Sequence, residues 1–488
     1  MKGVAMSVKD RYIKDVIERG DEGSAFLAAK CAPTLKNCEY VDVLREGMNG
    51  LAVLRIPQEY CVVVHSACGD PSMRFPHAYA ASLVNELYSQ ARRVNATPVG
   101  FADVIDARVG DRALIEELAD GMIEIANYHK LAIMNGELAI LGDRLNCDAN
   151  MNGTMISISP KGSLPHGLFE RGGCKYCVFN QGGMAVYMNS DGVGTKTEFY
   201  ERAGLYGKAL DDSAAMKADD GAKNGAIINV MFDTVETSGY IPRVGLDGRA
   251  EELSRILGAA YLLNYEDVGN RLRGWRDGEP AFNVSGSAVS VIDENRLRNP
   301  PTPQAGDHIM AIKGKPNPRS NGITDKRRIM VKMFGENWHE TREGKIFMEF
   351  LAEPSVVFYP VFNELIENGA ATSVYHMSGG AYNGKLARPL AKHGLYAALE
   401  NIFPADWREL AIAGFSLTPA EAAYAKWPMG NDGFITTQNP YAALGILGRH
   451  RLLGRIVGKV EDAQDDMTGV TLVGIKGSDG KDVYFPGK

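Results

Sequence analysis

The first part of the chain shows the same order of features twice, and this repeat constrains the fold more than any other property. In the first copy, an apolar strand at 60–64 leads into the turn HSACGDPS. In the second copy, a strand at 184–188 leads into the turn NSDGVGTK. A helical segment, a strand ending in an acid, a second helix, another acid-bearing strand and a glycine-containing strand then follow in both copies. Strands that alternate with amphipathic helices predict an α/β or α+β fold.

The spacing of acidic residues favours a duplication over two unrelated α/β segments. Asp103 and Glu137 lie 34 residues apart in the first copy, and Asp233 and Glu266 lie 33 apart in the second. Chance alternation of strands and helices would reproduce the element order, but less often the positions of the acids.

The copies are expected at 36–160 and 165–297, preceded by a segment at 1–35. A single copy leaves one sheet face without cover, so the two sheets are expected to pack on each other as in a fused dimer. Apolar rows between them would include Val62, Val64, Ile133 and Ile156.

A proline-rich segment, RNPPTPQAGD, separates the copies from a second kind of domain. This C-terminal α/β domain is predicted at 305–460, and a hairpin that turns at SDGK is predicted at 461–488.

Composition excludes several classes of function. Lys and Arg number 53 against 60 Asp and Glu, a net charge of −7, and no basic run stands out. This argues against binding to nucleic acid or a membrane surface. The start of the chain lacks the apolar core of a signal peptide, the longest apolar stretches are strand-sized, and seven cysteines are few and odd in number. We therefore expect a cytoplasmic protein that binds neither nucleic acid nor a membrane.

The turn at 190–196 is the strongest chemical signal. Gly192 and Gly194 permit a tight turn and close approach of an anion to the backbone. Lys196 offers a charge for phosphate, Thr195 a hydroxyl, and Asp191 a ligand for a divalent cation. The turn matches neither a P-loop nor a dinucleotide-binding motif, and an ordinary turn is the alternative.

Acidic residues after this turn strengthen the phosphate hypothesis. Asp212, Asp219 and Asp220 lie on one predicted helix, and Asp212 and Asp219 share a face because seven residues make two turns. Asp233 and Glu266 follow at strand ends. Converging carboxylates are typical of sites where Mg²⁺ carries the phosphates of a nucleotide. A solvated acidic helix is the alternative.

Two polar, glycine-rich loops in the C-terminal domain are further candidates. They read NPRSNG at 317–322 and HMSGG at 376–380, each between apolar elements. Their backbone N–H groups are suited to a phosphate or ribose, and ordinary loop chemistry is the alternative. The CxxC at Cys174 and Cys177 lacks the second ligand pair of a zinc site and the strand-to-helix context of a redox motif.

The order of these motifs resembles aminoimidazole ribonucleotide synthase, also called phosphoribosylformylglycinamidine cyclo-ligase. The motifs DGVGTK, ADDGAKNGA, FDT, YED, RSNG, HMSGG and WPMGNDGF occur in the family's order from about 178 to 460. The resemblance implies a ferredoxin-like N-terminal domain and dimers whose N-terminal domains form a barrel. Here the first copy, which lacks the phosphate turn and is interpreted as degenerate, would supply that partner internally. A further homo-oligomer stays open.

The resemblance also implies an ATP-dependent reaction of de novo purine synthesis with Mg²⁺ and a ribonucleotide substrate. ATP would phosphorylate the amide oxygen of formylglycinamidine ribonucleotide, and an internal nitrogen would then displace phosphate and close the imidazole ring. The metal ligands would be Asp191, Asp220 and Glu266, and the nucleotide would contact Gly192, Val193, Gly194, Thr195, Lys196, Asp212 and Asp233. Substrate would contact Arg319, Ser320, Asn321, Gly322, His376, Ser378, Gly379 and Gly380, with Asp191, Lys196, Asn321 and His376 acting in catalysis.

Departures from the family pattern keep two alternatives open. Arg319 stands where the family often has His, and Asn264 and Tyr265 replace two glycines. Selenophosphate synthase is the nearest alternative enzyme, because GGCKYC lies just before the phosphate turn. The other alternative is a non-catalytic paralogue that binds nucleotide.

Overall fold

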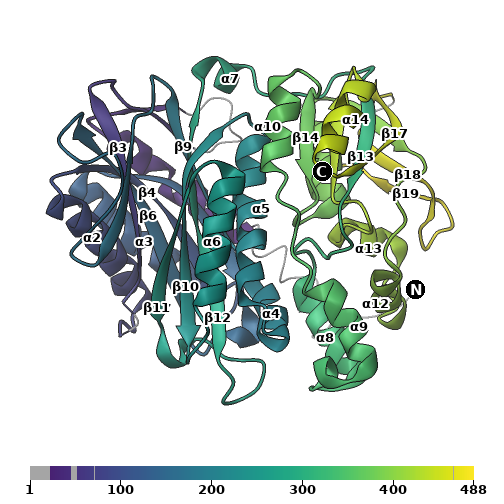
Figure 1. The fold of residues 1–488 in the computed structure, drawn as a ribbon, viewed down its shortest axis with the longest axis horizontal. Coiled ribbons are helices and arrows are strands. Elements are labelled where there is room, and N and C mark those ends of the chain that lie inside the picture. The colour runs from purple at the N-terminus through teal and green to yellow at the C-terminus, as the bar shows by residue number, and fades with distance from the viewer. Residues whose placement is uncertain (1–21, 45–51, 71, 465–466, 488) are drawn as a thin grey trace, which may run out of the picture. The chain divides into compact units, whose positions relative to one another are not determined.

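The computed structural model describes residues 22–44, 52–70, 72–464 and 467–487 (Figure 1). They form two compact units. Unit 1 holds the described residues up to Glu198 together with Ile227–Arg298, and unit 2 holds Phe199–Ala226 together with the described residues from Asn299 onward. Both units combine sheets with helices, which confirms the predicted α+β class. Within the described ranges, no helix is long and apolar enough to cross a membrane.

The first sheet of unit 1 has six strands in the order β5-β4-β6-β3-β8-β7. Only β4 and β5 run parallel. The strands are β3 (Tyr60–Cys68), β4 (Thr97–Ala107), β5 (Ala132–Ile140), β6 (Ala149–Pro160), β7 (Gly167–Arg171) and β8 (Cys174–Phe179), and the helices between them are α2 (Pro76–Arg93) and α3 (Arg112–His129).

The second sheet repeats this order as β11-β10-β12-β9, extended by β2 and β1. Again only one pair, β10 and β11, runs parallel. Its elements are β1 (Asp42–Leu44), β2 (Val53–Arg55), β9 (Ala185–Gly192), β10 (Ile227–Ser238), β11 (Ala260–Asp267), β12 (Ala281–Ile292) and the helices α6 (Val244–Leu257) and α7 (Glu294–Arg298). Each sheet therefore contains strands from both predicted copies, because β1 and β2 join the second sheet while β7 and β8 join the first.

The strand register aligns the two copies residue by residue. Asp103 pairs with Gly153 as Asp233 pairs with Gly286. Ala67 also pairs with Gly153, and Asp191 with Gly286, so the turns HSACGDPS and NSDGVGTK align as the sequence predicted.

The predicted equivalence of Glu137 and Glu266 was wrong, because the strand register places them two residues apart. Glu137 pairs with Val104, which lies one position beyond Asp103. Glu266 pairs with Glu236, which lies three positions beyond Asp233. Nearly equal spacings between the acids suggested equivalence, but hydrogen-bond register defines the equivalent positions in a sheet.

The two sheets bury a shared apolar layer. Val62, Val64 and Ile156 from the first sheet lie in one cluster with Val186 and Phe232 from the second. The prediction that Ile133 belongs to this layer was wrong. Ile133 packs on the opposite face, beneath α2 and α3, because both faces of β5 are covered and alternation alone does not select one.

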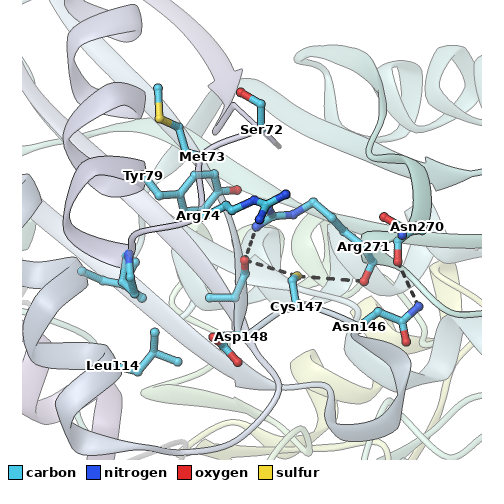
Figure 2. A pocket seen from close by; sticks show the side chains of 13 residues that line it. Ser72, Met73, Arg74, Tyr79, Leu114, Asn146, Cys147, Asp148, Asn270 and Arg271 are labelled. Atoms are coloured by element: carbon cyan, nitrogen blue, oxygen red, sulfur yellow. Dashed lines mark hydrogen bonds between the residues drawn. The ribbon is translucent and has the colours of Figure 1, made fainter.

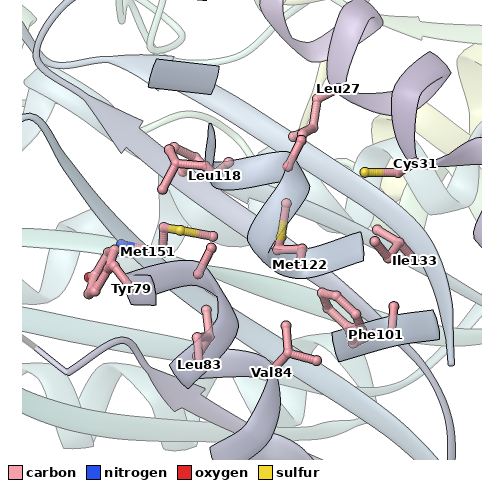
Figure 3. Packing of buried hydrophobic residues seen from close by; sticks show 14 of the residues in the cluster. Leu27, Cys31, Tyr79, Leu83, Val84, Phe101, Leu118, Met122, Ile133 and Met151 are labelled. Atoms are coloured by element: carbon pink, nitrogen blue, oxygen red, sulfur yellow. The ribbon is translucent and has the colours of Figure 1, made fainter. Parts of the chain in front are cut away.

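The layer between the first sheet and its helices is the second core of unit 1 (Figure 3). Helix α3 begins at the cap Asp111, whose carboxylate accepts from Ala113 N, and ends at Lys130 in the left-handed region. Its apolar positions, among them Leu118 and Met122, recur at helical spacing and face the sheet.

Asp103 is an unusual buried carboxyl group beside this core. It is fully buried, and neither carboxylate oxygen has a hydrogen-bond partner among the described residues. Burial raises the pKa of Asp103 to about 8. The folded chain therefore holds this proton at pH values where the unfolded chain has lost it.

The substitution Asp103→Asn is expected to stabilise the protein more at pH 8 than at pH 5. At pH 5 the wild-type carboxyl is protonated and resembles the amide. As pH rises toward 8, the wild type loses stability by up to about 1.4 kcal/mol per pH unit, because the unfolded state releases the proton first. Thermal melting of both proteins across this range measures the effect, and a difference in Tm that does not change with pH would contradict the assignment.

Unit 2 is built on a seven-stranded sheet in the order β14-β16-β13-β17-β15-β18-β19. Strands β18 and β19 pair antiparallel through the SDGK turn. The strands are β13 (His308–Lys313), β14 (Ser373–His376), β15 (Leu395–Leu399), β16 (Gly433–Thr437), β17 (Leu453–Asp462), β18 (Gly469–Lys476) and β19 (Asp482–Phe485). The helices are α5 (Ala209–Ala222), α8 (Ile323–Phe334), α9 (Arg342–Leu351), α10 (Tyr359–Glu367), α11 (Arg388–Lys392), α12 (Trp407–Phe415), α13 (Ala420–Lys426) and α14 (Pro440–Arg449); α4 (Thr197–Ala203) spans the boundary of the units.

Candidate functional site

The predicted phosphate turn closes the end of β9. Gly194 has a φ of +63° and opens the short 3-10 helix Gly194–Lys196. The Asp191 carboxylate accepts from Gly192 N at 2.7 Å. Thr195 and Lys196 are both buried, and Lys196 completely so, so its charge lies inside the protein rather than in open solvent.

Two buried carboxylates face each other across the two sheets of unit 1. The Asn283 amide donates to Asp106 Oδ2 at 2.7 Å and to Glu236 Oε2 at 3.0 Å. Cys68 Sγ lies 3.3 Å from Glu236 Oε1. The second oxygen of Asp106 is buried and has no partner among the described residues. One amide thus links acids from both copies.

These two carboxyl groups belong to a longer row of acidic side chains. Burial, and then the neighbouring Glu236, raise the pKa of Asp106 well above its usual range, and Asp191 adds to the rise. Burial also raises the pKa of Glu236, against the opposing hydrogen bonds of Asn283 and Cys68. The pKa of Glu266 rises through burial and the charge of Glu236. Four acids in succession therefore influence one another: Asp191, Asp106, Glu236 and Glu266.

Asp106, Glu236 and Asn283 are not among the residues predicted from the sequence. The signal was present, because an acid follows three residues after Asp103 and again after Asp233. Alternation along a strand places residues three apart on opposite faces. Asp106 and Glu236 therefore reach the face between the sheets, whereas the two selected acids point the other way.

Asp233, predicted to support the nucleotide, is fully buried and accepts from Tyr261 OH at 2.5 Å. The backbone of Gly286 passes so close that a Cβ there would lie 2.0 Å from Phe232 O and 2.7 Å from Asp233 Oδ1. A role for Asp233 toward a nucleotide stays a prediction.

Reciprocal contacts join the two copies. The 3-10 turn Gly142–Arg144 of the first copy meets the turn Gly269–Arg271 of the second, and Leu145 and Leu272 form an antiparallel bridge between them. Two backbone bonds flank the bridge symmetrically, Asn146 N to Arg271 O and Arg273 N to Arg144 O, each at 2.9 Å.

In unit 2, three acids of α5 are buried, namely Asp211, Asp212 and Asp219, and Asp220 is partly exposed, so the alternative of a solvated acidic helix is wrong. Asp212 accepts from Ser355 N at 2.8 Å and from the Tyr200 hydroxyl, and Asp219 accepts from Phe358 N at 2.7 Å. The two aspartates share a face, as predicted, and hold the segment that leads into α10.

Arg319 is buried and ties its loop to α5. Its guanidinium donates to Val356 O at 2.9 Å, pairs with Asp219 at 3.4 Å and lies 4.7 Å from the centre of the Phe358 ring. Burial raises the pKa of Asp219 to about 8, although Arg319 acts in the opposite direction. Contact of Arg319 with a substrate stays a prediction.

Asp220 and His376 form a second polar contact of unit 2. His376 Nε2 lies 2.8 Å from Asp220 Oδ1, while its Nδ1 is buried without a partner among the described residues. Burial lowers the pKa of His376 to about 4, which makes the ring neutral near pH 7. Burial acts to raise the pKa of Asp220, but Lys223, Lys385 and His376 outweigh it and lower the pKa well below its usual value.

The two glycine-rich loops of unit 2 meet and carry backbone strain. The Asn321 amide donates to Ser378 O at 2.6 Å. Arg319 and Ser320 have φ of +48° and +52°, and Ala381, directly after Gly379 and Gly380, has φ of +37°. A Cβ at Gly322 would lie 2.0 Å from Trp427 Nε1. Strain of this kind often gathers at functional sites.

The three predicted metal ligands lie in different units, Asp191 and Glu266 in unit 1 and Asp220 in unit 2. Over the described residues, no three His, Cys, Asp or Glu side chains are arranged to hold a metal ion by themselves. Mg²⁺ in nucleotide sites is commonly held by one or two carboxylates together with phosphate oxygens, so the carboxylate row fits a metal that arrives with its nucleotide.

The CxxC cysteines point to opposite faces of the first sheet. Cys177 lies in the layer between the two sheets, and Cys174 lies in the cluster on the other side of β8. Both are free thiols, and this arrangement excludes a disulfide between them.

Part of the chain is similar to a known protein family. Residues 49–158 match the family described as AIR synthase related protein, N-terminal domain. The match lies on the first copy, the one interpreted as degenerate. Residues 49–158 are therefore similar to a domain of this family, as the resemblance drawn from the sequence predicted.

The chain is also similar to particular curated proteins and to solved structures. The chain is 28% identical over 229 residues to the phosphoribosylformylglycinamidine cyclo-ligase of Synechococcus sp. (strain RCC307), covering 46% of this chain and 64% of that protein. It is 28% identical over 202 residues to the enzyme of the same name from Thermococcus kodakarensis, covering 41% and 58%. The chain thus spans about three fifths of the length of these relatives. Among solved structures, thiamine monophosphate kinase from Aquifex aeolicus aligns over 62% of this chain and 90% of its own, with 14% identity and a TM-score of 0.38.

Proposed function

We propose that this protein is an ATP-dependent enzyme of the AIR synthase superfamily, whose nucleotide site lies at the turn 190–196 and the carboxylate row of unit 1. The observation that carries the proposal is the row itself. Asp106, Glu236 and Glu266 are neighbouring acids whose pKa values are all raised, and Asp191 at the glycine-rich turn adds its charge to Asp106. Buried like charges cost stability, and a bound cation relieves that cost.

The two copies would act as a built-in dimer. Matching sheet orders, matching register and the reciprocal bonds around Leu145 and Leu272 are what a two-fold interface between equivalent domains produces. Placing Asp106 from one copy beside Glu236 from the other would make the nucleotide site depend on both. We interpret each copy as a ferredoxin-like domain extended by strands from its neighbour.

Unit 2 would hold the acceptor substrate. The joined loops at 317–322 and 376–380 supply strained backbone, the Asn321 amide and the neutral His376 ring, whose Nδ1 has no partner among the described residues. Because the ionised Asp220 accepts from Nε2, Nδ1 of the neutral ring carries the lone pair and is able to accept a hydrogen bond or a proton.

The substrate is inferred from the relatives. Phosphorylation of the amide oxygen of formylglycinamidine ribonucleotide would replace a poor leaving group with phosphate. Attack by the internal nitrogen would then form the ring C–N bond, release phosphate and lose one proton. Bound Mg²⁺ would neutralise phosphate charge, while Lys196 and the N–H groups of the turn would orient the phosphates.

The test is turnover of ATP by the full chain with formylglycinamidine ribonucleotide. We expect ADP, phosphate and the closed ring in equal amounts. ATP binding without turnover would favour the non-catalytic alternative, and turnover with selenide instead would favour selenophosphate synthase.

The substitution Asp191→Asn is expected to weaken binding of Mg·ATP by at least about tenfold, because it removes one charge-assisted contact to the metal. The near-isosteric change keeps the acceptor for Gly192 N, so the fold should persist. Calorimetric titration of Mg·ATP measures the loss. Asp277→Asn, at an exposed aspartate of unit 1, is the matched control. Equal affinity of both variants would remove Asp191 from the metal role.

A further inference from the structure

Unit 1 contains a hollow that the proposed function does not use (Figure 2). Its volume is about 520 Å³, within the range of small-molecule pockets. It lies where the first copy's turn enters α2, and it is closed by α3, by residues 146–149 and by Asn270 and Arg271 of the second copy.

Two arginines line this hollow. Arg74 is exposed and has no ion-pair partner among the described residues. Arg271 reaches across from the second copy, donates to Asn150 Oδ1 at 2.6 Å and lies 4.9 Å from the centre of the Tyr79 ring. The one acid in the lining, Asp148, is paired with Arg108 at 3.0 Å. The hollow therefore presents an excess of positive charge to a ligand.

The chemistry differs from that of the proposed nucleotide site, although the two turns are equivalent. By strand register and turn alignment, Ala67 stands at the position of Asp191, and Ser72 at that of Lys196. The first copy thus lacks the turn's metal-ligand candidate, and the hollow beside its turn is lined by two guanidinium groups instead. Guanidinium binds phosphate directly through paired N–H donors, without a metal.

Apolar side chains form the other wall. Leu114 and Leu118 from α3 line the hollow beside Pro76, Met73 and the Tyr79 ring. A bare inorganic anion would leave this wall uncovered, whereas a ligand with an apolar or flat body would fill it.

We propose that this hollow binds a phosphate monoester with an apolar or aromatic body, independently of metal, with Arg74 and Arg271 holding the phosphate. The proposal does not rest on the activity proposed for the other site. The first copy would then bind a ligand of its own, although it lacks the glycine-rich phosphate turn.

The experiment is calorimetric titration of the full chain, in excess EDTA, with phenyl phosphate and with inorganic phosphate. Phenyl phosphate is expected to bind about tenfold more tightly, because its ring covers the apolar wall. Arg74→Glu should weaken phenyl phosphate by at least about tenfold, since it replaces a cation with an anion. Arg74→Lys should retain most of the affinity.

Arg171→Glu is the matched control. It makes the same charge change at an exposed arginine of unit 1, on β7, outside the hollow. Unchanged binding in this control and loss in Arg74→Glu would support the site. Absence of phenyl phosphate binding, a requirement for Mg²⁺, or equal affinities of the two Glu variants would overturn it.

Discussion

A chain that begins at residue 181 is expected to be insoluble or to assemble with a second copy of itself. The cut falls between β8 and β9, so it removes the whole first sheet together with β1 and β2 of the second. It uncovers one face of the second sheet, including Val186, Met188 and Phe232. Each such side chain stabilises the fold by roughly 1.5–3 kcal/mol when buried, and domains are stable by only about 5–15 kcal/mol.

Gel filtration and thermal melting of this fragment measure the effect. Co-expression with residues 1–180 is the control, because it restores the missing face without a covalent link and should recover soluble protein. A new homodimer of the fragment would support the built-in dimer, since a second copy would then replace the missing partner. A folded monomer that binds Mg·ATP as tightly as the whole chain would contradict it.

The substitution Glu236→Gln is expected to raise stability and to abolish most nucleotide binding. It removes one of two like charges buried beside each other, so melting should shift upward by several degrees at neutral pH. The same charge is needed against a cation carried by ATP, so affinity for Mg·ATP should fall by at least about tenfold. An acid with only a structural role would change the melting temperature without lowering the affinity for Mg·ATP.

Asp103→Asn is the matched comparison for this variant. Asp103 is also a buried carboxylate with a raised pKa, but it lies on the helix side of its sheet, away from the carboxylate row. It should raise the melting temperature and leave nucleotide affinity unchanged. Full nucleotide affinity in Glu236→Gln would show that the row is not the nucleotide site.

The two turns show what the local sequence pattern could predict. HSACGDPS and NSDGVGTK aligned correctly from sequence, because each directly follows a strand and the register from strand to turn is continuous. The α+β class followed from the alternation of strand and helix periodicity in the same way. The burial of the α5 acids did not follow, because backbone N–H groups from 355–358, far along the chain, provide their partners.

Sequence by itself determined the order of elements and the glycine-rich turns, since these depend on residues close together in the chain. Only the tertiary structure decided which face of each strand meets the other sheet. Ile133 illustrates the reason, because both faces of β5 are covered and apolar residues occur on both. The meeting of Asp106 with Glu236 through Asn283 likewise required the two sheets to pack with one defined register. A one-residue slip turns every side chain of a strand to the opposite face, so the position of the acids is a property of the packed sheets.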